Sequence, residues 1–433
     1  MVPDPRFFDA LVVGAGISGL TSALDLAEAG FKVALVEKAA SIGGTMIALS
    51  KVFPTLDCAS CITSPRMAAA AHHPGIGIFT CTTVDSIRRD GPFFKAELTK
   101  KPRYVDESLC IGCRQCEYAC PVDVRHEFEG GMGARKAIYV PFATAVPQKA
   151  LLDAENCMLC GSCERVCPTH AVDYLQKPEK IALRASAVIL ATGFKLLPRE
   201  IKKEYAPEKS INILTALQME RLLSPHGPYE RVIRPSDGKV PGSIAYVQCA
   251  GSRDRSLGIP YCSRVCCMYA IKQAMLLSGA LPLADITIYY MDIRAFGKGY
   301  EEFYQNAKAM GIAFVKAKVA SLMEDPGEHN VTVRVELMEE DGRVEERTHD
   351  MAVLSLGMVP GCGPGEFTGV GRGDDGFIEC AEPQTAPALT GRKGVFVAGT
   401  ASGPKDIADS IVESGSAAME AANYIRSLKG ASD

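Results

Sequence analysis

Two runs of cysteines constrain this chain more than any other feature of its sequence. Each run contains four cysteines with the spacing C-x2-C-x2-C-x3-C and is closed by a proline. This is the ligand spacing of the cubane iron–sulfur clusters in two-cluster ferredoxins. The runs are CIGCRQCEYACP, with Cys110, Cys113, Cys116 and Cys120, and CMLCGSCERVCP, with Cys157, Cys160, Cys163 and Cys167.

The spacing also predicts which cysteines share a cluster. A [4Fe-4S] cluster needs four thiolates, and in two-cluster ferredoxins the fourth cysteine of each run ligates the other cluster. Zinc is the less favoured interpretation, because zinc sites are built from CxxC pairs and not from two complete runs. We therefore expect one cluster on Cys110, Cys113, Cys116 and Cys167, and a second on Cys157, Cys160, Cys163 and Cys120.

Length and composition indicate a multi-domain redox protein. The 433 residues exceed one typical core, so two or three domains are expected. The formal net charge of -4 gives no electrostatic argument for a nucleic-acid partner. No signal-peptide pattern precedes the first apolar strand, and seventeen cysteines in such a chain favour the reducing cytoplasm. No apolar window reaches the length of a membrane span, so we expect membrane association only through partners.

The N-terminal segment predicts a dinucleotide site. An apolar strand at residues 10–13 is followed by GAGISG and by a helix to about residue 29, and a second strand ends in Glu37. In this arrangement the glycines allow a tight turn and a close approach of the pyrophosphate to the helix N-terminus. The acidic residue is placed to accept hydrogen bonds from a ribose.

Three further segments favour FAD over NAD at this site. GGT follows the second strand, VILATG covers residues 188–193, and the C-terminal VFVAGTASGPKDIADS supplies a last strand and a helix N-terminus. Related flavoproteins usually have Asp after the glycine of that last strand, whereas Thr400 follows Gly399 here. The candidate FAD-binding residues are Gly14, Gly16, Ser18, Gly19, Glu37, Lys38, Gly43, Gly44, Thr45, Gly193, Gly399, Thr400, Lys405 and Ile407.

A third group of cysteines lies in a predicted second Rossmann-like lobe. Its first strand is SIAYVQC at residues 243–249, with a helix from about residue 264 to 278 and a further strand DITIYYM. A nicotinamide site would need glycines in the turn after that first strand, and only Gly251 is near it. We expect a third cluster there in place of the nucleotide, although buried apolar cysteines are the alternative. The four cysteines are Cys249, Cys262, Cys266 and Cys267.

The sequence resembles the A subunit of heterodisulfide reductases and its relatives. The resemblance runs along essentially the whole chain and is carried by FPTLDCASCITSPRM, KKPRYVDESLCIGC, YVQCAGSRD, YCSRVCCMYAIK and VFVAGTASGPKDIADS. It implies an FAD-containing subunit that distributes electrons among iron–sulfur clusters, in some members by flavin-based electron bifurcation. It further implies that the third cysteine group holds a cluster near the flavin and that Lys272 lies beside the isoalloxazine.

The residues themselves allow the same interpretation of Lys272. It lies five positions after Cys267 on the same predicted helix, where an ammonium could stabilise an anionic reduced flavin. A solvated helix lysine is the alternative.

Compared with the methanogen subunit of this family, we expect the chain to be a short form, without the extra N-terminal domain and the C-terminal ferredoxin module. Short relatives resemble subunits of the quinone-interacting membrane-bound oxidoreductase of sulfate reducers, or of heterodisulfide-reductase-like complexes of sulfur or aromatic metabolism. The sequence does not choose between these two kinds of complex. Partners are expected to be other subunits of such a complex and a ferredoxin-like electron donor or acceptor.

Five other cysteines complete the set. Cys58 and Cys61, in DCASC, could form a redox dithiol, an incomplete metal site or a packing contact. Cys81, Cys362 and Cys380 are solitary and are expected to be structural.

These motifs predict an α/β two-dinucleotide-binding-domain flavoprotein, thioredoxin-reductase-like, with an inserted two-cluster ferredoxin module. A discontinuous FAD-binding domain is expected at residues 1–100, 178–235 and 360–433, the ferredoxin module at 101–177 and the second lobe at 236–359. The favoured function is electron transfer within a larger complex, as one oxidoreductase subunit of it. The alternative is a self-contained NAD(P)H-dependent reductase similar to the glutamate synthase small subunit, which the missing glycine fingerprint disfavours.

Overall fold

The computed structural model describes residues 6–205, 210–361 and 369–430. The chain folds into two compact units. The flavin-type unit contains residues 1–47, 61–194 and 360–433, and the second lobe contains residues 48–60 and 195–359. The strands at the two main boundaries are β11 (Phe194–Leu196) and β19 (Met358–Pro360).

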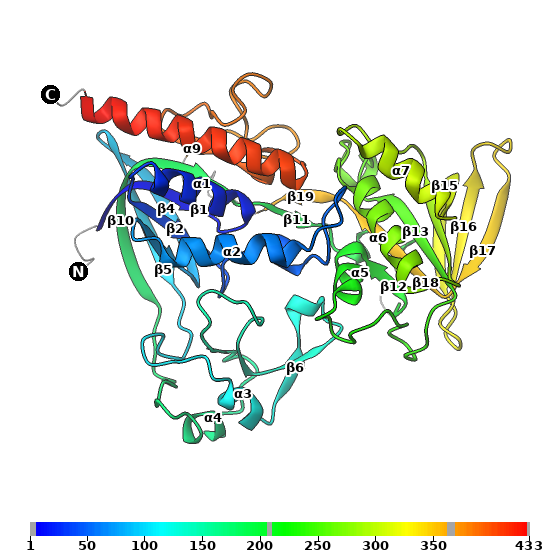
Figure 1. Ribbon diagram of the computed structural model, residues 1–433, viewed down its shortest axis with the longest axis horizontal. Coiled ribbons are helices and arrows are strands. Elements are labelled where there is room, and N and C mark those ends of the chain that lie inside the picture. The colour runs from blue at the N-terminus through cyan, green and yellow to red at the C-terminus, as the bar shows by residue number, and fades with distance from the viewer. Residues whose placement is uncertain (1–5, 206–209, 362–368, 431–433) are drawn as a thin grey trace. The chain divides into compact units, whose positions relative to one another are not determined.

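A seven-stranded sheet forms the centre of the flavin-type unit (Figure 1). Its order is β3-β2-β1-β10-β5-β4, with β20 parallel to β10. The first four strands run parallel, whereas β5 and β4 are antiparallel. The strands are β1 (Arg6–Val13), β2 (Val33–Val36), β3 (Ile76–Phe79), β4 (Thr82–Asp90), β5 (Phe93–Lys100), β10 (Glu179–Leu190) and β20 (Val395–Val397).

Helices α1 (Ile17–Glu28) and α9 (Ile407–Gly430) pack together on this sheet (Figure 1). Apolar residues recur every three or four positions on α1, so that Leu20, Ala23 and Ala27 share one core with Ala417 and Ala421 of α9. The small side chains allow the two helix backbones to approach closely. The other helical segments here are η1 (Met46–Ala48), α2 (Ala59–His72) and η5 (Gly399–Ser402).

The ferredoxin-like insert follows β5 and returns to the sheet at β10. It has little regular structure, which is expected where loops are organised around cysteines. Its elements are α3 (Gln115–Ala119), β6 (Asp123–Arg125), η2 (Glu127–Glu129), β7 (Ala134–Lys136), β8 (Ile138–Tyr139), β9 (Leu151–Leu152) and α4 (Ser162–Arg165).

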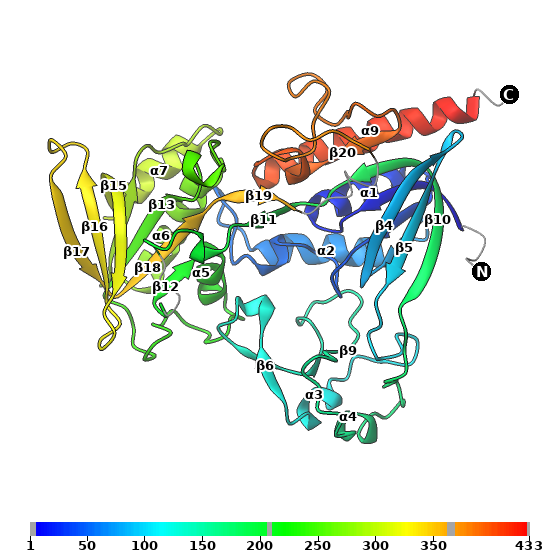
Figure 2. The same cartoon turned by 180° about the vertical axis from the view of Figure 1, so that it is seen from behind.

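A second seven-stranded sheet forms the second lobe, with the order β12-β18-β13-β14-β15-β16-β17 (Figure 2). The first five strands are parallel and the last two are antiparallel. Its elements are η3 (Arg199–Ile201), β12 (Ile213–Thr215), α5 (Ala216–Leu223), β13 (Ser243–Ala250), η4 (Arg255–Leu257), α6 (Cys266–Ala280), β14 (Asp285–Tyr290), α7 (Tyr300–Ala309), β15 (Ala313–Glu324), β16 (Val331–Leu337), β17 (Val344–His349) and β18 (Met351–Leu356).

The unit boundaries differ from those expected from the sequence. Residues 195–235 and 48–60 were expected in the flavin domain, but they belong to the second lobe. The reason is tertiary: β12 pairs in parallel with β18, from Ile213 opposite Ala352 to Thr215 opposite Leu354. Helix α5 then packs on α6, where the Gln273 side chain donates a hydrogen bond to the Ala216 carbonyl.

Candidate functional site

The turn between β1 and α1 forms a cradle of close backbone contacts. Gly14 has φ +99°, and a Cβ there would lie 2.2 Å from the Ala191 carbonyl oxygen. A Cβ on Gly19 would lie 1.8 Å from the Gly14 carbonyl oxygen. Gly16 differs, because its Cβ would meet nothing closer than 3.8 Å within the protein. Gly14 and Gly19 are therefore required by the turn itself, while Gly16 leaves room for a ligand to approach the backbone.

Glu37 braces this turn from the end of β2. One carboxylate oxygen accepts a hydrogen bond from the Ala15 amide at 2.8 Å, and the other accepts from the Ala39 amide at 2.9 Å. Each carboxylate oxygen has a further lone pair, so Glu37 keeps acceptor capacity for a ribose hydroxyl. Lys38, which follows Glu37 in the chain, and Thr45 are both exposed.

Two other glycine segments complete the cradle. Gly44 has φ +61°, and its Cβ would lie 2.6 Å from the Cα of Gly16. Gly399, with φ +63°, meets the Ser18 side chain, since a Cβ would lie 1.9 Å from the Ser18 Oγ. Three segments far apart in sequence thus approach one another closely at glycines, which is the geometry that an extended dinucleotide requires.

The remaining predicted FAD-binding residues lie at the edge of this cradle. Gly193 has φ +69°, and a Cβ there would lie 3.9 Å from the Thr400 Oγ1. The Lys405 ammonium is ion-paired with Glu413 and lies 2.7 Å from the Ser402 Oγ, just before α9 begins at Ile407. Burial raises the pKa of Glu413, although Lys405 opposes that shift. Gly43 is buried with φ +118°.

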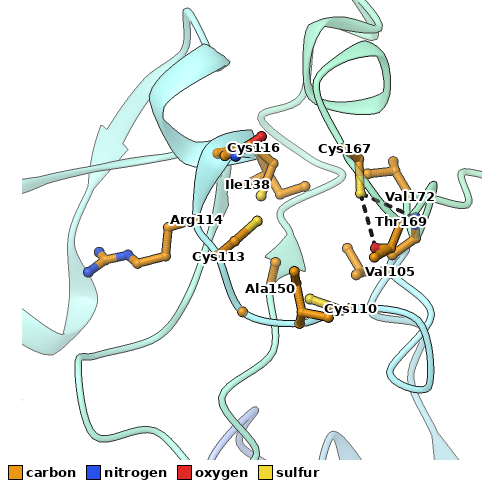
Figure 3. Close-up of a pocket in the computed structure, with 14 residues that line it drawn as sticks. Val105, Cys110, Cys113, Arg114, Cys116, Ile138, Ala150, Cys167, Thr169 and Val172 are labelled. Atoms are coloured by element: carbon orange, nitrogen blue, oxygen red, sulfur yellow. Dashed lines mark hydrogen bonds between the residues drawn. The ribbon is translucent and has the colours of Figure 1, made fainter.

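In the insert, cysteines from the two runs surround a shared cavity (Figure 3). Cys110, Cys113 and Cys116 line it together with Cys167, which approaches from the other run. The rest of the lining is largely apolar and includes Val105, Ile138, Ala150 and Val172. Burial raises the pKa of the Cys116 thiol to about 12. The structure thus groups the four cysteines as the ferredoxin spacing predicts.

A second cavity has the complementary set of cysteines. It is lined by Cys120, Cys157, Cys160 and Cys163, together with Leu152 and Tyr174 among others. The two runs also share a backbone pattern, because φ is positive at Gly112 and Arg114 in the first and at the equivalent Leu159 and Gly161 in the second. Left-handed residues at matching positions turn both loops so that their sulfur atoms face inwards.

The third cysteine group lies between β13 and the start of α6. Cys249 is the next-to-last residue of β13 and has φ +57°, and Cys266 and Cys267 are the first two residues of α6. Burial raises the pKa of Cys266, and neighbouring charge on Cys267, Cys249 and Cys262 raises it further. Burial likewise raises the pKa of Cys267, to about 11. The structure therefore brings all four thiols within electrostatic reach of one another.

The segment joining β13 to α6 is packed and is not an open phosphate turn. A Cβ on Gly251, which has φ +87°, would lie 2.6 Å from the Leu197 Cδ1. The hydroxyls of Ser252 and Ser263 are buried and lie 2.6 Å apart. Helix η4 also intervenes before α6 begins, so no helix N-terminus directly follows the strand.

Lys272 on α6 is a buried ion-pair partner and not the solvated lysine of the alternative interpretation. Its side chain is 2% exposed, forms an ion pair with Glu220 of α5, and donates a hydrogen bond to the Lys51 carbonyl at 2.8 Å. Glu220 also accepts from the Ser50 hydroxyl at 2.7 Å and from the Gln273 amide. Burial lowers the pKa of Lys272, and Glu220 opposes that shift.

Glu220 was not among the residues predicted from the sequence. A capping box between Thr215 and Gln218 begins α5 and sets its register, so that Met219 and Glu220 are both buried. An acidic residue on a buried helix face is the only local signal, and it gives no indication of the partner.

The remaining cysteines have no cluster-like grouping in the described part of the chain. Cys58 and Cys61 are both disulfide-bonded, which makes an incomplete metal site the least suitable of the three interpretations. Cys81 is buried and Cys380 is partly buried, both as free thiols. Cys362 lies outside the described residues.

Two kinds of feature are absent from residues 6–205, 210–361 and 369–430. No group of three or more His, Cys, Asp or Glu in these ranges is arranged to hold one metal ion. Cubane ligands differ from such a group, because each thiolate binds a different iron atom. In the same part of the chain, no helix combines the length and apolarity needed to cross a membrane.

Two protein families match separate parts of the chain. Residues 9–60 match the family described as FAD dependent oxidoreductase, and residues 109–171 match the 4Fe-4S dicluster domain. The first match contains the glycine cradle and the second contains both cysteine runs. FAD and [4Fe-4S] clusters are therefore the cofactor types of these domains.

Curated relatives match the chain along almost its whole length. The A subunit of the H(2):CoB-CoM heterodisulfide,ferredoxin reductase of Methanothermobacter thermautotrophicus is 43% identical over 95% of this chain and 63% of its own length. The A subunit of the H(2)/formate:CoB-CoM heterodisulfide,ferredoxin reductase of Methanococcus maripaludis is 46% identical, with the same coverage. The chain thus spans less than two thirds of the length of these relatives.

Solved structures show the fold. Thioredoxin reductase of T. acidophilum superimposes with a TM-score of 0.55 at 16% identity, covering 98% of this chain and 99% of its own. Thioredoxin reductase of Lactococcus lactis gives a TM-score of 0.56 at 14% identity, covering 97% of this chain and 99% of its own. The predicted thioredoxin-reductase-like α/β fold is confirmed.

Proposed function

Because the chain belongs to the A-subunit family of heterodisulfide reductases, we propose that it is the FAD- and iron–sulfur-containing electron-transfer component of a heterodisulfide-reductase-like complex. One observation carries this proposal. Two cysteine-lined cavities lie in one insert, and this insert belongs to the same compact unit as the glycine cradle. Flavin and clusters supply two-electron and one-electron steps respectively, so this unit combines the parts of an electron distributor.

The eight cysteines of the insert are proposed to hold two [4Fe-4S] clusters. Each cavity has four sulfur side chains and a mainly apolar wall, which limits solvent access to a cluster. Cys110, Cys113, Cys116 and Cys167 would ligate one cluster, and Cys120, Cys157, Cys160 and Cys163 would ligate the other.

The third cluster, on Cys249, Cys262, Cys266 and Cys267, is also a proposal. Their mutual electrostatic influence and their burial support it. Thiol pKa values raised by burial are no obstacle, since a bound metal cluster deprotonates its cysteine ligands.

We further propose that Lys272 stabilises negative charge on the reduced flavin. Its burial excludes the water that would screen the ammonium, while the Glu220 carboxylate beside it offsets part of the positive charge. The FAD itself is assigned to the cradle of Gly14, Gly16, Gly19, Gly44 and Gly399, with Glu37 at the ribose.

A self-contained NAD(P)H reductase is the less favoured function. The packed segment after β13 leaves no glycine turn for a second dinucleotide, because Gly251 already contacts Leu197 and Ser252 is buried. Electrons are proposed to arrive from other subunits or from a ferredoxin-like carrier. We propose in addition that the flavin divides electron pairs between two acceptors by flavin-based bifurcation.

Cofactor analysis and rapid mixing test the function together. Anaerobic iron, sulfide and flavin analysis should give one FAD and about twelve iron atoms per chain if all three clusters are present. Stopped-flow mixing with excess NADH or NADPH should leave the flavin oxidised, whereas a reduced low-potential ferredoxin should bleach it. Fast two-electron bleaching by a nicotinamide would contradict the complex-subunit proposal, and about eight irons would remove the third cluster.

A further inference from the structure

Hydroxyl groups distinguish the two cysteine-lined cavities of the insert. In the cavity of Cys120, Cys157, Cys160 and Cys163, the Tyr174 Oη lies 3.2 Å from the Cys163 Sγ. The Ser162 Oγ lies 3.4 Å from the Cys160 Sγ. In the other cavity the Thr169 Oγ1 lies farther from its sulfur, 3.7 Å from the Cys167 Sγ.

The direction of the Tyr174 hydrogen bond follows from ligand chemistry. In the thiol form, either Cys163 or Tyr174 could be the donor. A cysteine bound to iron is a thiolate without a proton, so only the phenol can then donate. Ser162 can donate to the Cys160 sulfur in the same way. Its Oγ accepts a hydrogen bond from the Arg165 guanidinium at 3.1 Å, so its own hydroxyl hydrogen is available to the sulfur.

Each cavity has a nearby cation that donates to a cysteine carbonyl, although Cys110 and Cys160 are not at equivalent positions of their runs. The Lys149 ammonium donates to the Cys110 carbonyl at 2.5 Å, and the Arg165 guanidinium donates to the Cys160 carbonyl at 3.5 Å. Backbone donors are also present on both sides, from Ala171 to the Cys167 Sγ at 3.3 Å and from Leu159 to the Cys157 Sγ at 3.4 Å. The cavities also differ in their hydroxyl groups, since two lie within 3.4 Å of a sulfur in one cavity and the one in the other lies at 3.7 Å.

We propose that Tyr174, through its hydrogen bond to Cys163, raises the reduction potential of the cluster on Cys120, Cys157, Cys160 and Cys163 above that of its neighbour. Reduction adds negative charge that is shared with the ligand sulfurs, and a donor aimed at such a sulfur stabilises the reduced form. This cluster is then the first of the two to accept an electron. Tyr174 is a positioning residue that acts through its ligand, and the inference rests on the two-cluster assignment of the proposed function.

Tyr174→Phe in the full chain tests the inference, because it removes the hydroxyl and keeps the ring. Wild type and variant are titrated anaerobically with dithionite, and the reduced clusters are followed by electron paramagnetic resonance. The higher-potential of the two steps from the insert should shift to lower potential in the variant, while the other step and the iron content stay unchanged. In D2O, the hyperfine coupling of an exchangeable deuteron to the first-reduced cluster should be lost in the variant, which a purely structural role would not produce.

Two further variants serve as matched controls. Tyr118→Phe removes a phenol hydroxyl from an 82% exposed side chain of the same insert and should leave both steps unchanged. Ser162→Ala removes the second hydroxyl of the same cavity and should lower the same step as Tyr174→Phe. This variant tests the hydrogen-bond argument even if the tyrosine substitution disturbs folding.

The outcomes separate the inference from the proposed function. Unchanged potentials in Tyr174→Phe with full iron content would overturn the role of Tyr174 and leave the clusters in place. A shift of the lower-potential step would contradict the assignment of the cavity. Iron analysis that finds no clusters in the insert of the wild-type chain would overturn the proposed function, and the inference with it.

Discussion

The turns after β1 and after β13 occupy the same topological position in two α/β units, but they differ in length, in residue types and in packing. After β1, three residues lead directly into α1, and the contacts of Gly14 and Gly19 leave no room for a Cβ. After β13, the connection contains η4, the buried Ser252 and Ser263, and Cys262 before α6 begins. The comparison shows that the same strand–turn–helix position can be packed in different ways, and that in the first turn glycines leave backbone open to a dinucleotide.

The first prediction concerns a substitution that blocks the proposed FAD site at the turn after β1. Gly16→Val should weaken FAD binding by about a hundredfold or more, because its side chain would occupy the space left for the pyrophosphate. The nearest heavy atom to its Cβ within the protein is 3.8 Å away, so the fold should remain intact. Flavin absorbance after desalting, with circular dichroism for folding, measures both effects.

Gly251→Ala is the matched control in the second turn. Its Cβ would press on the Leu197 side chain and would force alanine into a left-handed conformation, so stability should fall by about 1 to 2 kcal/mol while one FAD per chain is retained. Stoichiometric FAD in Gly16→Val would show that the first turn is not the pyrophosphate site.

The second prediction concerns the cysteines of the second turn. Cys266→Ala or Cys267→Ala should remove about four of about twelve irons and leave both clusters of the insert and the FAD in place, because a cubane needs four thiolates. Cys81→Ala, at a buried free cysteine outside the three groups, should leave the iron content unchanged. If either variant at the start of α6 retained all its iron, that residue would not be a ligand.

The third prediction tests the buried ion pair that joins α5 and α6. Lys272→Ala leaves the Glu220 carboxylate buried without its cation, which should lower the free energy of unfolding by about 3 to 5 kcal/mol. The paired change Glu220→Gln with Lys272→Met should recover much of that loss. Urea unfolding of the three proteins gives the comparison.

If Lys272 stabilises the reduced flavin as proposed, Lys272→Ala should also lower the flavin potential without loss of FAD, because a cation beside the flavin favours its anionic reduced forms. A redox titration of the folded wild type and variant, without urea, measures the flavin potential separately from the stability. Superimposable potentials would restrict Lys272 to a structural role.

The fourth prediction concerns the pH dependence of the second lobe alone. Burial lowers the pKa of His349 from 6.5 to about 4, and its Nε2 lies 2.9 Å from the Tyr289 Oη. The unfolded chain binds a proton near its ordinary pKa while the folded lobe does not, so stability is lost as the pH falls through this interval. The loss should be about 2 kcal/mol between about pH 7 and pH 5.

His349→Gln should remove this part of the pH dependence, because its amide has no proton equilibrium in that range. Unfolding of the second lobe by urea at the two pH values, compared between wild type and variant, is the measurement. An equal loss in both proteins would assign the pH dependence to other groups.

Local sequence was sufficient for the features that depend on neighbouring residues. The cysteine spacing predicted how the eight cysteines of the insert divide between the two cavities, and the glycine pattern predicted the turn between β1 and α1. Strands β13 and β14 and helix α6 also lie within two residues of their predicted bounds. The steric limits of a tight turn and the spacing of cysteine ligands both depend on only a few neighbouring residues. A short sequence motif is therefore enough to predict them.

Only the tertiary structure decided the features that join distant segments. Residues 195–235 join the second lobe because β12 pairs with β18, about 140 positions later in the chain. Lys272 is neutralised by Glu220, which lies 52 residues earlier and is buried by the register of α5. The contact between Tyr174 and Cys163 likewise depends on how the loop after the second cysteine run folds back. Such partners are selected by burial and by strand pairing over the whole lobe, and no local pattern of residues records that selection.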